Sequence, residues 1–192
     1  MPEIVLVRHG ETLWTRSGQH TGRTDIPLTD EGRRQSELVG RSLRDRAFAL
    51  VLTSPLQRAA ETCRLAGVGD VAVVRDELAE WDYGAYEGRK TVDIRGERSG
   101  WSLWRDGVPD GETAADVGRR ADRVVEELRS ADGDAAVFAH GHLLRVLAAR
   151  WLGLDPAEGR LFALDPASLS ILGYERETQV IRLWNESLAR HA

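Results

Sequence analysis

The feature that most constrains the fold is an alternation of short apolar runs with amphipathic segments. Apolar runs at residues 4–7, 48–52, 71–74 and 135–139 predict buried strands. Amphipathic segments predict helices from Thr29 to about Arg46, from Ser54 to about Gly67, from Thr113 through Leu128, and from about His142 to Leu152. Two later runs, 168–174 and 179–184, flank a turn and predict an antiparallel hairpin. This pattern is typical of an α/β domain with a mainly parallel sheet.

Helix-start signals sharpen these boundaries. Thr29 and Thr113 are suited to capping the helices that follow them. Ser54-Pro55-Leu56-Gln57 predicts a third helix start, with Ser54 as N-cap and Gln57 completing a capping box. The polar stretch 10–28 is expected to be a loop. Residues 80–112 are expected to be irregular, with one short helix.

Length and composition point to one domain over residues 1–192, with enough chain for a sizeable core. A net charge of −5 argues against general binding of nucleic acid, because no basic excess is available to neutralise phosphates. The single cysteine, Cys63, excludes an internal disulfide framework and favours the cytoplasm. The early apolar run is too short for a membrane span and lacks the basic leader of a signal peptide, so no membrane association is expected.

Two of the predicted strands run directly into a histidine and a glycine. Arg8 and His9 follow the first strand, and His140 and Gly141 follow the fourth. Because ligands of α/β sheets bind at the carboxyl ends of parallel strands, both histidines should lie at the same edge. Arg58 follows the second strand, just inside the next helix. Guanidinium groups match phosphate oxygens as bidentate donors, so this edge is predicted to bind an anion.

Other interpretations of the same residues stay open. A histidine after a strand is most often structural, and Arg58 alone would most often be a solvated helix residue. His140 and His142 form an H-x-H pair that could bind a metal, with Glu80 as a third ligand. Arg8 and Arg58 would repel a cation, so neither a metal nor another cofactor is expected.

Five motifs occur in a fixed order: RHGET, LTDEG, SPLQRAAET, LAEWDYGAYEG and AHGH. Together they resemble the histidine phosphatase superfamily, also called phosphoglycerate mutase-like, over nearly the whole chain. The resemblance implies a three-layer α/β/α sandwich. It also implies that His9 is the nucleophile that becomes phosphohistidine, and that Glu80 is the acid/base. Phosphate oxygens would be bound by Arg8, Arg58, His140 and the adjoining Gly141.

The chemistry suits these residue types. A neutral imidazole can attack phosphorus, while the arginines and a protonated His140 would neutralise the equatorial oxygens. Glu80 with a raised pKa could protonate the leaving oxygen and then deprotonate water. Asp82 and Glu87 are the competing carboxylates. If Glu80 must start protonated and His140 charged, activity should be highest below neutral pH.

Details within the motifs favour a phosphatase of small phosphorylated metabolites, such as sugar phosphates, over a cofactor-dependent phosphoglycerate mutase or a non-catalytic binding module. The segments 17–29 and 80–88 resemble the branch with acid phosphatases and a sugar-bisphosphate phosphatase. Thr15 stands where the mutases carry asparagine. The candidate substrate-binding residues are Thr15, His20, Thr21, Gly22 and Tyr83.

Four further residues have open roles. His142 and Arg145 could support the site, contact substrate, or simply begin a helix. Trp101 and Trp104 could form a lid, although core packing or an interface is favoured. A homodimer is also expected from the resemblance.

Overall fold

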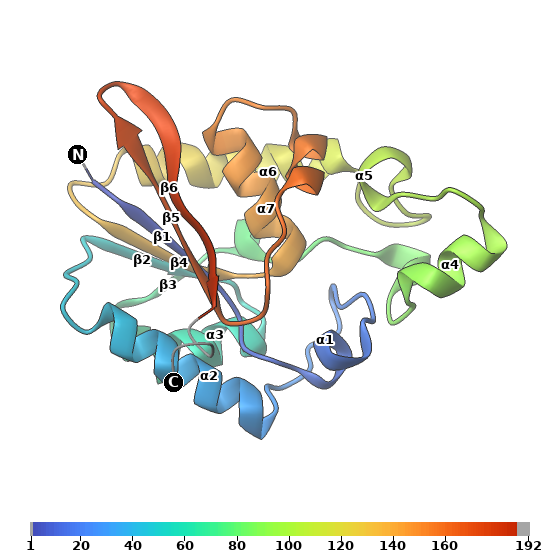
Figure 1. The fold of residues 1–192 in the computed structure, drawn as a ribbon, viewed down its shortest axis with the longest axis horizontal. Coiled ribbons are helices and arrows are strands. Elements are labelled where there is room, and N and C mark those ends of the chain that lie inside the picture. Colours follow the sequence, from blue (N-terminus) through green and yellow to red (C-terminus); the bar gives the residue numbers. More distant parts are fainter. Residues whose placement is uncertain (1, 188–192) are drawn as a thin grey trace.

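A computed structural model describes residues 2–187 and contains one six-stranded sheet in the order β3-β2-β4-β1-β5-β6 (Figure 1). The strands are β1 (Ile4–Arg8), β2 (Leu50–Thr53), β3 (Val73–Val74), β4 (Ala135–Ala139), β5 (Ser168–Glu175) and β6 (Thr178–Ser187). The four strands β1 to β4 pair in parallel, while β5 pairs antiparallel with both β1 and β6. The predicted mainly parallel sheet with an antiparallel hairpin is therefore confirmed.

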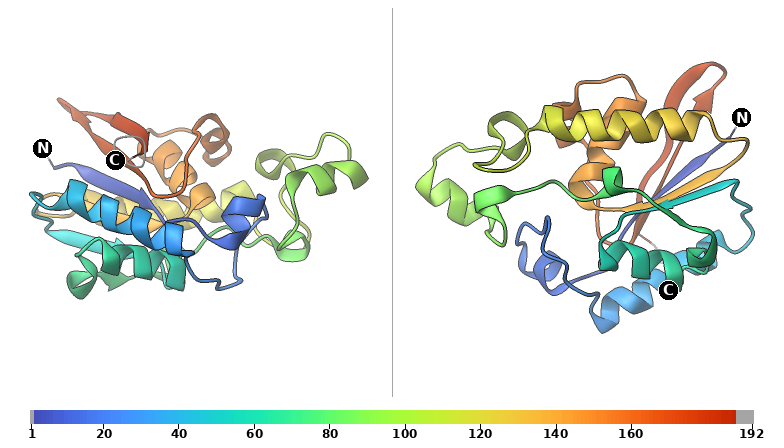
Figure 2. Two further views of the ribbon diagram at one scale, coloured as in Figure 1. Left: turned by 60° about the horizontal axis from the view of Figure 1, so that its bottom comes forward. Right: turned by 180° about the vertical axis from the view of Figure 1, so that it is seen from behind.

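Helices cover both faces of the sheet and make three layers (Figures 1 and 2). Helices α2 (Asp30–Leu43) and α3 (Gln57–Leu65) lie on one face, and α6 (Ala114–Arg129) and α7 (Gly141–Trp151) lie on the other. The side chains of β1 alternate between the layers: Ile4 and Leu6 pack toward α6 and α7, and Val5 and Val7 toward α2 and α3. A strand buried on both faces explains the uninterrupted apolar run in the sequence.

Short helices lie beyond the carboxyl ends of the parallel strands. They are α1 (Leu13–Ser17), α4 (Thr91–Glu97) and α5 (Leu103–Asp106), and Figure 1 shows them to the right of the sheet. Four 3₁₀ turns complete the described chain, at Gly69–Val71, Asp76–Leu78, Gly84–Tyr86 and Pro156–Leu161. The segment from β3 to α6 reaches across this end of the molecule and supplies part of the site.

Several boundaries differ from the sequence predictions. The expected loop 10–28 contains helix α1, because Thr12 and Thr15 form a local capping box. The segment 80–112 has two short α-helices instead of one. The third strand is shorter than predicted because a 3₁₀ turn occupies residues 69–71, and the second strand is displaced to residues 50–53.

The predicted helix start at Ser54 is wrong. Helix α3 begins at Gln57, and its N-cap, Leu56, offers no side-chain hydrogen bond. The Gln57 N–H instead donates to Asp25 Oδ1 at 2.8 Å, a carboxylate supplied by the preceding loop. Ser54 lies before the helix, where its hydroxyl contacts His140. Ser54 keeps a local bond from Leu56 N at 3.2 Å, but it precedes the helix by three residues and its other contact is tertiary.

None of the helices within residues 2–187 combines the length and the apolar character that a membrane crossing requires.

Candidate active site

The carboxyl ends of β1 and β4 bring His9 and His140 together. Their ring centroids are 5.2 Å apart with the rings edge to face. Both side chains are buried, and the backbone N–H of His9 donates to the Ala139 carbonyl at 3.0 Å. The parallel pairing of β1 with β4 therefore sets the separation of the two imidazoles.

The ring of His9 is held in one tautomer. Its Nδ1 lies 2.8 Å from the Gly10 carbonyl, and a carbonyl can only accept, so Nδ1 carries the proton. The pKa of His9 is lowered well below its usual value, first by burial and then by the positive charges of Arg58 and Arg8. A neutral ring protonated at Nδ1 has its lone pair on Nε2, which is the form a nucleophile needs.

Arg8 reaches from the last position of β1 to the rim of the cavity. Its Nη1 donates to the Leu164 carbonyl, and burial lowers its pKa. Gly141 lies directly against this side chain, since a Cβ there would stand 3.2 Å from Arg8 Cζ and Nε. The glycine after His140 thus leaves room for the guanidinium.

Arg58 is fully buried on α3 and is held by backbone carbonyls. Nη1 donates to Thr24 O at 3.0 Å, and Nη2 donates to Thr21 O at 3.1 Å and Gly22 O at 3.0 Å. Burial is the main cause that lowers its pKa. These bonds fix the guanidinium to the loop between α1 and α2. Among the described residues, no carboxylate is hydrogen-bonded to this guanidinium.

His140 is oriented from the other side by Ser54, whose Oγ is 2.7 Å from Nε2. Burial, followed by the charges of Arg58, His9 and Arg8, lowers the pKa of His140 well below its usual value. In the site without a bound anion, burial and the two guanidinium groups therefore favour a neutral His140, whereas the sequence analysis predicted a protonated ring.

Three nitrogens of this cluster have no hydrogen-bond partner within residues 2–187. They are Arg8 Nε, Arg58 Nε and His140 Nδ1, and all three are buried. Buried polar atoms are almost always paired in folded proteins. Two of these nitrogens belong to the guanidinium groups themselves. Unpaired nitrogens in a positively charged cluster indicate that the site binds an anion.

Glu80 is the carboxylate that faces this cluster. Its Oε1 accepts from the backbone N–H groups of Trp81 at 2.8 Å and Leu143 at 2.9 Å, and its Oε2 accepts from His142 N at 3.0 Å. Two of these donors belong to the first turn of α7, whose positive end favours an anion. The start of α7 therefore fixes the carboxylate beside the cavity.

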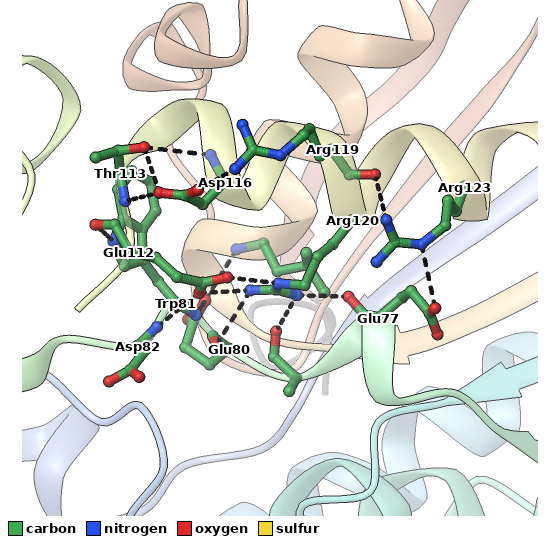
Figure 3. Close-up of polar contacts among 12 residues, drawn as sticks. Glu77, Glu80, Trp81, Asp82, Glu112, Thr113, Asp116, Arg119, Arg120 and Arg123 are labelled. Atoms are coloured by element: carbon green, nitrogen blue, oxygen red, sulfur yellow. Dashed lines mark hydrogen bonds and ion pairs between the residues drawn. The ribbon is translucent and has the colours of Figure 1, made fainter.

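Arg120 of α6 holds the backbone that carries Glu80 (Figure 3). It pairs with both oxygens of Glu112 at 2.7 and 2.8 Å, and its Nη1 donates to the carbonyls of Glu77 at 2.6 Å and Ala79 at 2.9 Å. This pair could not be predicted from the sequence, because Arg120 has no feature that separates it from the other arginines of α6.

The competing carboxylates are engaged elsewhere. Asp82 pairs with Arg23 at 2.7 Å and accepts from Gly84 N at 3.0 Å. Glu87 accepts from Gly22 N at 2.9 Å and Thr24 N at 3.1 Å, which braces the loop that holds Arg58. Neither residue lines the cavity.

The cavity has a volume of about 190 Å³. It is lined by Arg8, His9, Trp14, Thr15, Gly18, Gln19, His20, Thr21, Glu80, Tyr83, Gly141, His142, Arg145 and Leu164. Four of the five predicted substrate-binding residues are among them. Gly22 is the exception and lies behind the wall, where a Cβ would come within 2.7 Å of Glu87 Oε2. Arg58 and His140 are fully buried and are not part of the lining.

Aromatic side chains build another part of the cavity wall. His142 Nδ1 lies 2.6 Å from the Tyr83 hydroxyl, and the His20 ring stacks on Tyr83 at 4.7 Å. Trp101 is buried in the core behind this wall, in line with the packing role favoured for it. The Arg145 guanidinium lies 4.6 Å above the Trp104 ring and donates to the Gly159 carbonyl at 3.0 Å.

The described residues contain no group of three His, Cys, Asp or Glu side chains that could hold a metal ion. His140 and His142, the pair considered for metal binding, instead contact Ser54 and Tyr83.

Comparisons with known proteins agree with this geometry. A family model described as histidine phosphatase superfamily (branch 1) matches residues 4–187. The acid phosphatase of Mycobacterium tuberculosis is 43% identical over 178 residues, covering 90% of this chain and 86% of that protein. Sedoheptulose 1,7-bisphosphatase of Saccharomyces cerevisiae is 38% identical over 185 residues, covering 80% and 68%. The solved structure of an open reading frame from M. tuberculosis superposes with a TM-score of 0.92 at 39% identity, covering 97% of this chain and 98% of that one.

Proposed function

Because this chain belongs to the histidine phosphatase superfamily and is a phosphatase, we propose that it hydrolyses small phosphorylated metabolites without a metal, through a phosphohistidine on His9. The observation that carries the proposal is the cluster of the buried His9, His140 and Arg58 with the half-buried Arg8, which holds three unpartnered nitrogens. The similarity to an acid phosphatase and to a sugar bisphosphatase supports a phosphorylated metabolite, such as a sugar phosphate, as substrate.

In the first step, the lone pair of His9 Nε2 attacks phosphorus and the bond from phosphorus to the ester oxygen breaks. The hydrogen bond from Nδ1 to the Gly10 carbonyl stabilises the positive charge that the ring acquires. Arg8, Arg58 and His140 bind the equatorial oxygens, whose charge must be neutralised in the transition state. Glu80, entering as the carboxylic acid, gives its proton to the leaving oxygen.

In the second step, water attacks the phosphorus of phosphohistidine. The Glu80 carboxylate takes a proton from the water, and the electron pair of the phosphorus–nitrogen bond returns to Nε2. Inorganic phosphate leaves, and His9 and Glu80 regain their starting forms. Every proton is carried by a residue of this chain, so the scheme needs no metal or other cofactor.

The size and lining of the cavity support a small polar substrate. A volume of about 190 Å³ suits a phosphoryl group with a small attached group. Thr15, His20, Thr21 and Tyr83 are the proposed substrate contacts. We propose a cytoplasmic enzyme without nucleic-acid or membrane partners, and a homodimer stays a prediction.

The test is hydrolysis of a chromogenic phosphate ester in the presence of EDTA, with His9→Ala as the paired variant. We expect turnover by the wild type and none by His9→Ala. A parallel assay uses 3-phosphoglycerate with and without 2,3-bisphosphoglycerate. Isomerisation that outpaces hydrolysis would replace the proposal with a mutase, and phosphate binding without turnover would replace it with a binding module.

A further inference from the structure

The hydroxyl of Ser54 makes two contacts in the core of the site. Ser54 is fully buried between β2 and α3. Its Oγ receives the Leu56 N–H at 3.2 Å and lies 2.7 Å from His140 Nε2. No other acceptor for the hydroxyl proton is found within the described chain.

Counting protons assigns the direction of the shorter contact. A hydroxyl has one proton and two lone pairs, and Leu56 N–H uses one lone pair. If the hydroxyl donates to Nε2, the neutral ring carries its proton on Nδ1, and that Nδ1–H is the one group of the pair without a partner among the described residues. If Nε2–H donated instead, the hydroxyl proton would be buried without an acceptor and the Nδ1 lone pair without a donor, so two groups would be unsatisfied instead of one.

The second arrangement would also misplace the lone pair of His140. Nδ1 is buried without a partner, as are Arg8 Nε and Arg58 Nε, which always carry protons, and the charges of both arginines act on His140. If a phosphoryl group binds beside these nitrogens, a lone pair on Nδ1 would repel its oxygens, whereas Nδ1–H would act with the two arginines as a third donor. The Ser54 contact therefore favours the tautomer that can bind a phosphoryl oxygen.

We propose that Ser54 is a positioning residue that fixes His140 as the neutral tautomer protonated at Nδ1, so that a neutral imidazole donates to the phosphoryl group. The proposal rests on the proposed function for the identity of the acceptor. It explains how His140 can bind phosphate without being charged.

The surroundings of His140 agree with a neutral ring. The charged and titratable groups that act on it are Arg58 from α3, Arg8 and His9 from β1, and Arg120 from α6. Each of these groups lowers the pKa of His140, and the carboxylate that faces the cluster, Glu80, is bonded to the start of α7. Because the Ser54 hydroxyl fixes His140 Nδ1–H as a neutral donor, the cluster does not have to hold a third positive charge.

The direct test is nitrogen-15 NMR of the histidine rings in the wild-type protein at pH 7.5, with His140 assigned by comparison with His140→Asn. We expect Nδ1 of His140 to carry the proton and Nε2 to be the acceptor. A ring protonated at Nε2, or at both nitrogens, would overturn the proposal. This measurement needs no turnover. If the protein proved inactive, the proposed function would be wrong, but the spectrum would still report the tautomer of His140.

Ser54→Ala supplies the kinetic test, and Ser170→Ala is its control, because Ser170 is also buried and its Oγ accepts one backbone N–H. Ser54→Ala should mix the tautomers of His140, lower kcat/KM about tenfold, and weaken inhibition by vanadate. Ser170→Ala should leave all three unchanged. An unchanged tautomer and kcat/KM in Ser54→Ala would contradict the proposal; if that variant does not fold, the wild-type spectrum decides.

Discussion

Gly10 and Gly32 face each other backbone to backbone. A Cβ on Gly10 would overlap the Gly32 carbonyl oxygen, and a Cβ on Gly32 would overlap the carbonyl oxygen of Glu11. The turn that carries His9 therefore rests directly on the first turn of α2. This contact explains in physical terms why the motifs RHGET and LTDEG each contain a glycine.

Gly32→Ala should consequently force the turn after β1 away from α2. Overpacking of this kind costs about 1–3 kcal/mol of unfolding free energy, and the displacement of His9 should also lower kcat. Gly96→Ala is the matched control, since Gly96 is also helical and has open space around it. Chemical denaturation and ester hydrolysis measure both effects. If the two variants were equally stable and active, the contact between Gly10 and Gly32 would not constrain the position of His9.

Glu80→Gln should slow hydrolysis in a way that depends on the leaving group. Esters with poor leaving groups need a proton as the bond breaks, whereas good leaving groups depart without one. We expect a loss of about 10²–10⁴-fold in kcat/KM, which reports formation of the phosphohistidine, for alkyl phosphates and a much smaller loss for nitrophenyl phosphate. Losses of the same size across a leaving-group series would take Glu80 out of the acid role.

Glu87→Gln should weaken the site without touching the cavity. The Glu87 carboxylate accepts from Gly22 N and Thr24 N, and the carbonyls of the same residues hold Arg58. Loss of these charge-assisted bonds should cost about 1–3 kcal/mol of stability and lower kcat through a looser guanidinium. Glu97→Gln, at an exposed pair with Arg89, should cost about 1 kcal/mol or less and leave kcat unchanged. Matching kinetics of the two variants would contradict the bracing role.

His20 should make the protein less stable in acid. Burial lowers its pKa to about 4, whereas the unfolded chain should have a value near 6.5. Between these values the unfolded state binds a proton that the folded state does not, so stability is lost as the pH falls through this window. His20→Gln should reduce the pH dependence by up to about 1.4 kcal/mol per pH unit. Urea unfolding from pH 7.5 to pH 4.5 measures it; identical slopes for both proteins would argue against a buried neutral His20.

Local sequence patterns predicted the elements that depend on local physics. Thr29 and Thr113 cap α2 and α6 as expected, with side chains that accept from Gly32 N and Asp116 N. The apolar runs gave the strands, and the parallel pairing of β1 with β4 placed the two histidines together.

Residues whose roles depend on distant partners could not be read in the same way. Ser54 has the local sequence of an N-cap, but its hydroxyl contacts His140, which lies 86 positions away. Arg120 bonds the backbone around Glu80 some 40 positions earlier, across a segment with no periodic pattern. The charge of His140 also depends on burial, which the motif AHGH does not reveal.

The account is tested most directly by trapping the covalent intermediate. Rapid quenching of the enzyme with a phosphorus-32-labelled ester, followed by digestion and peptide mapping under alkaline conditions, should place acid-labile label on the peptide that contains His9. The label should disappear in His9→Ala and accumulate when hydrolysis of the intermediate is slowed in Glu80→Gln. Turnover at the wild-type rate in His9→Ala, or label on any other residue, would contradict the account.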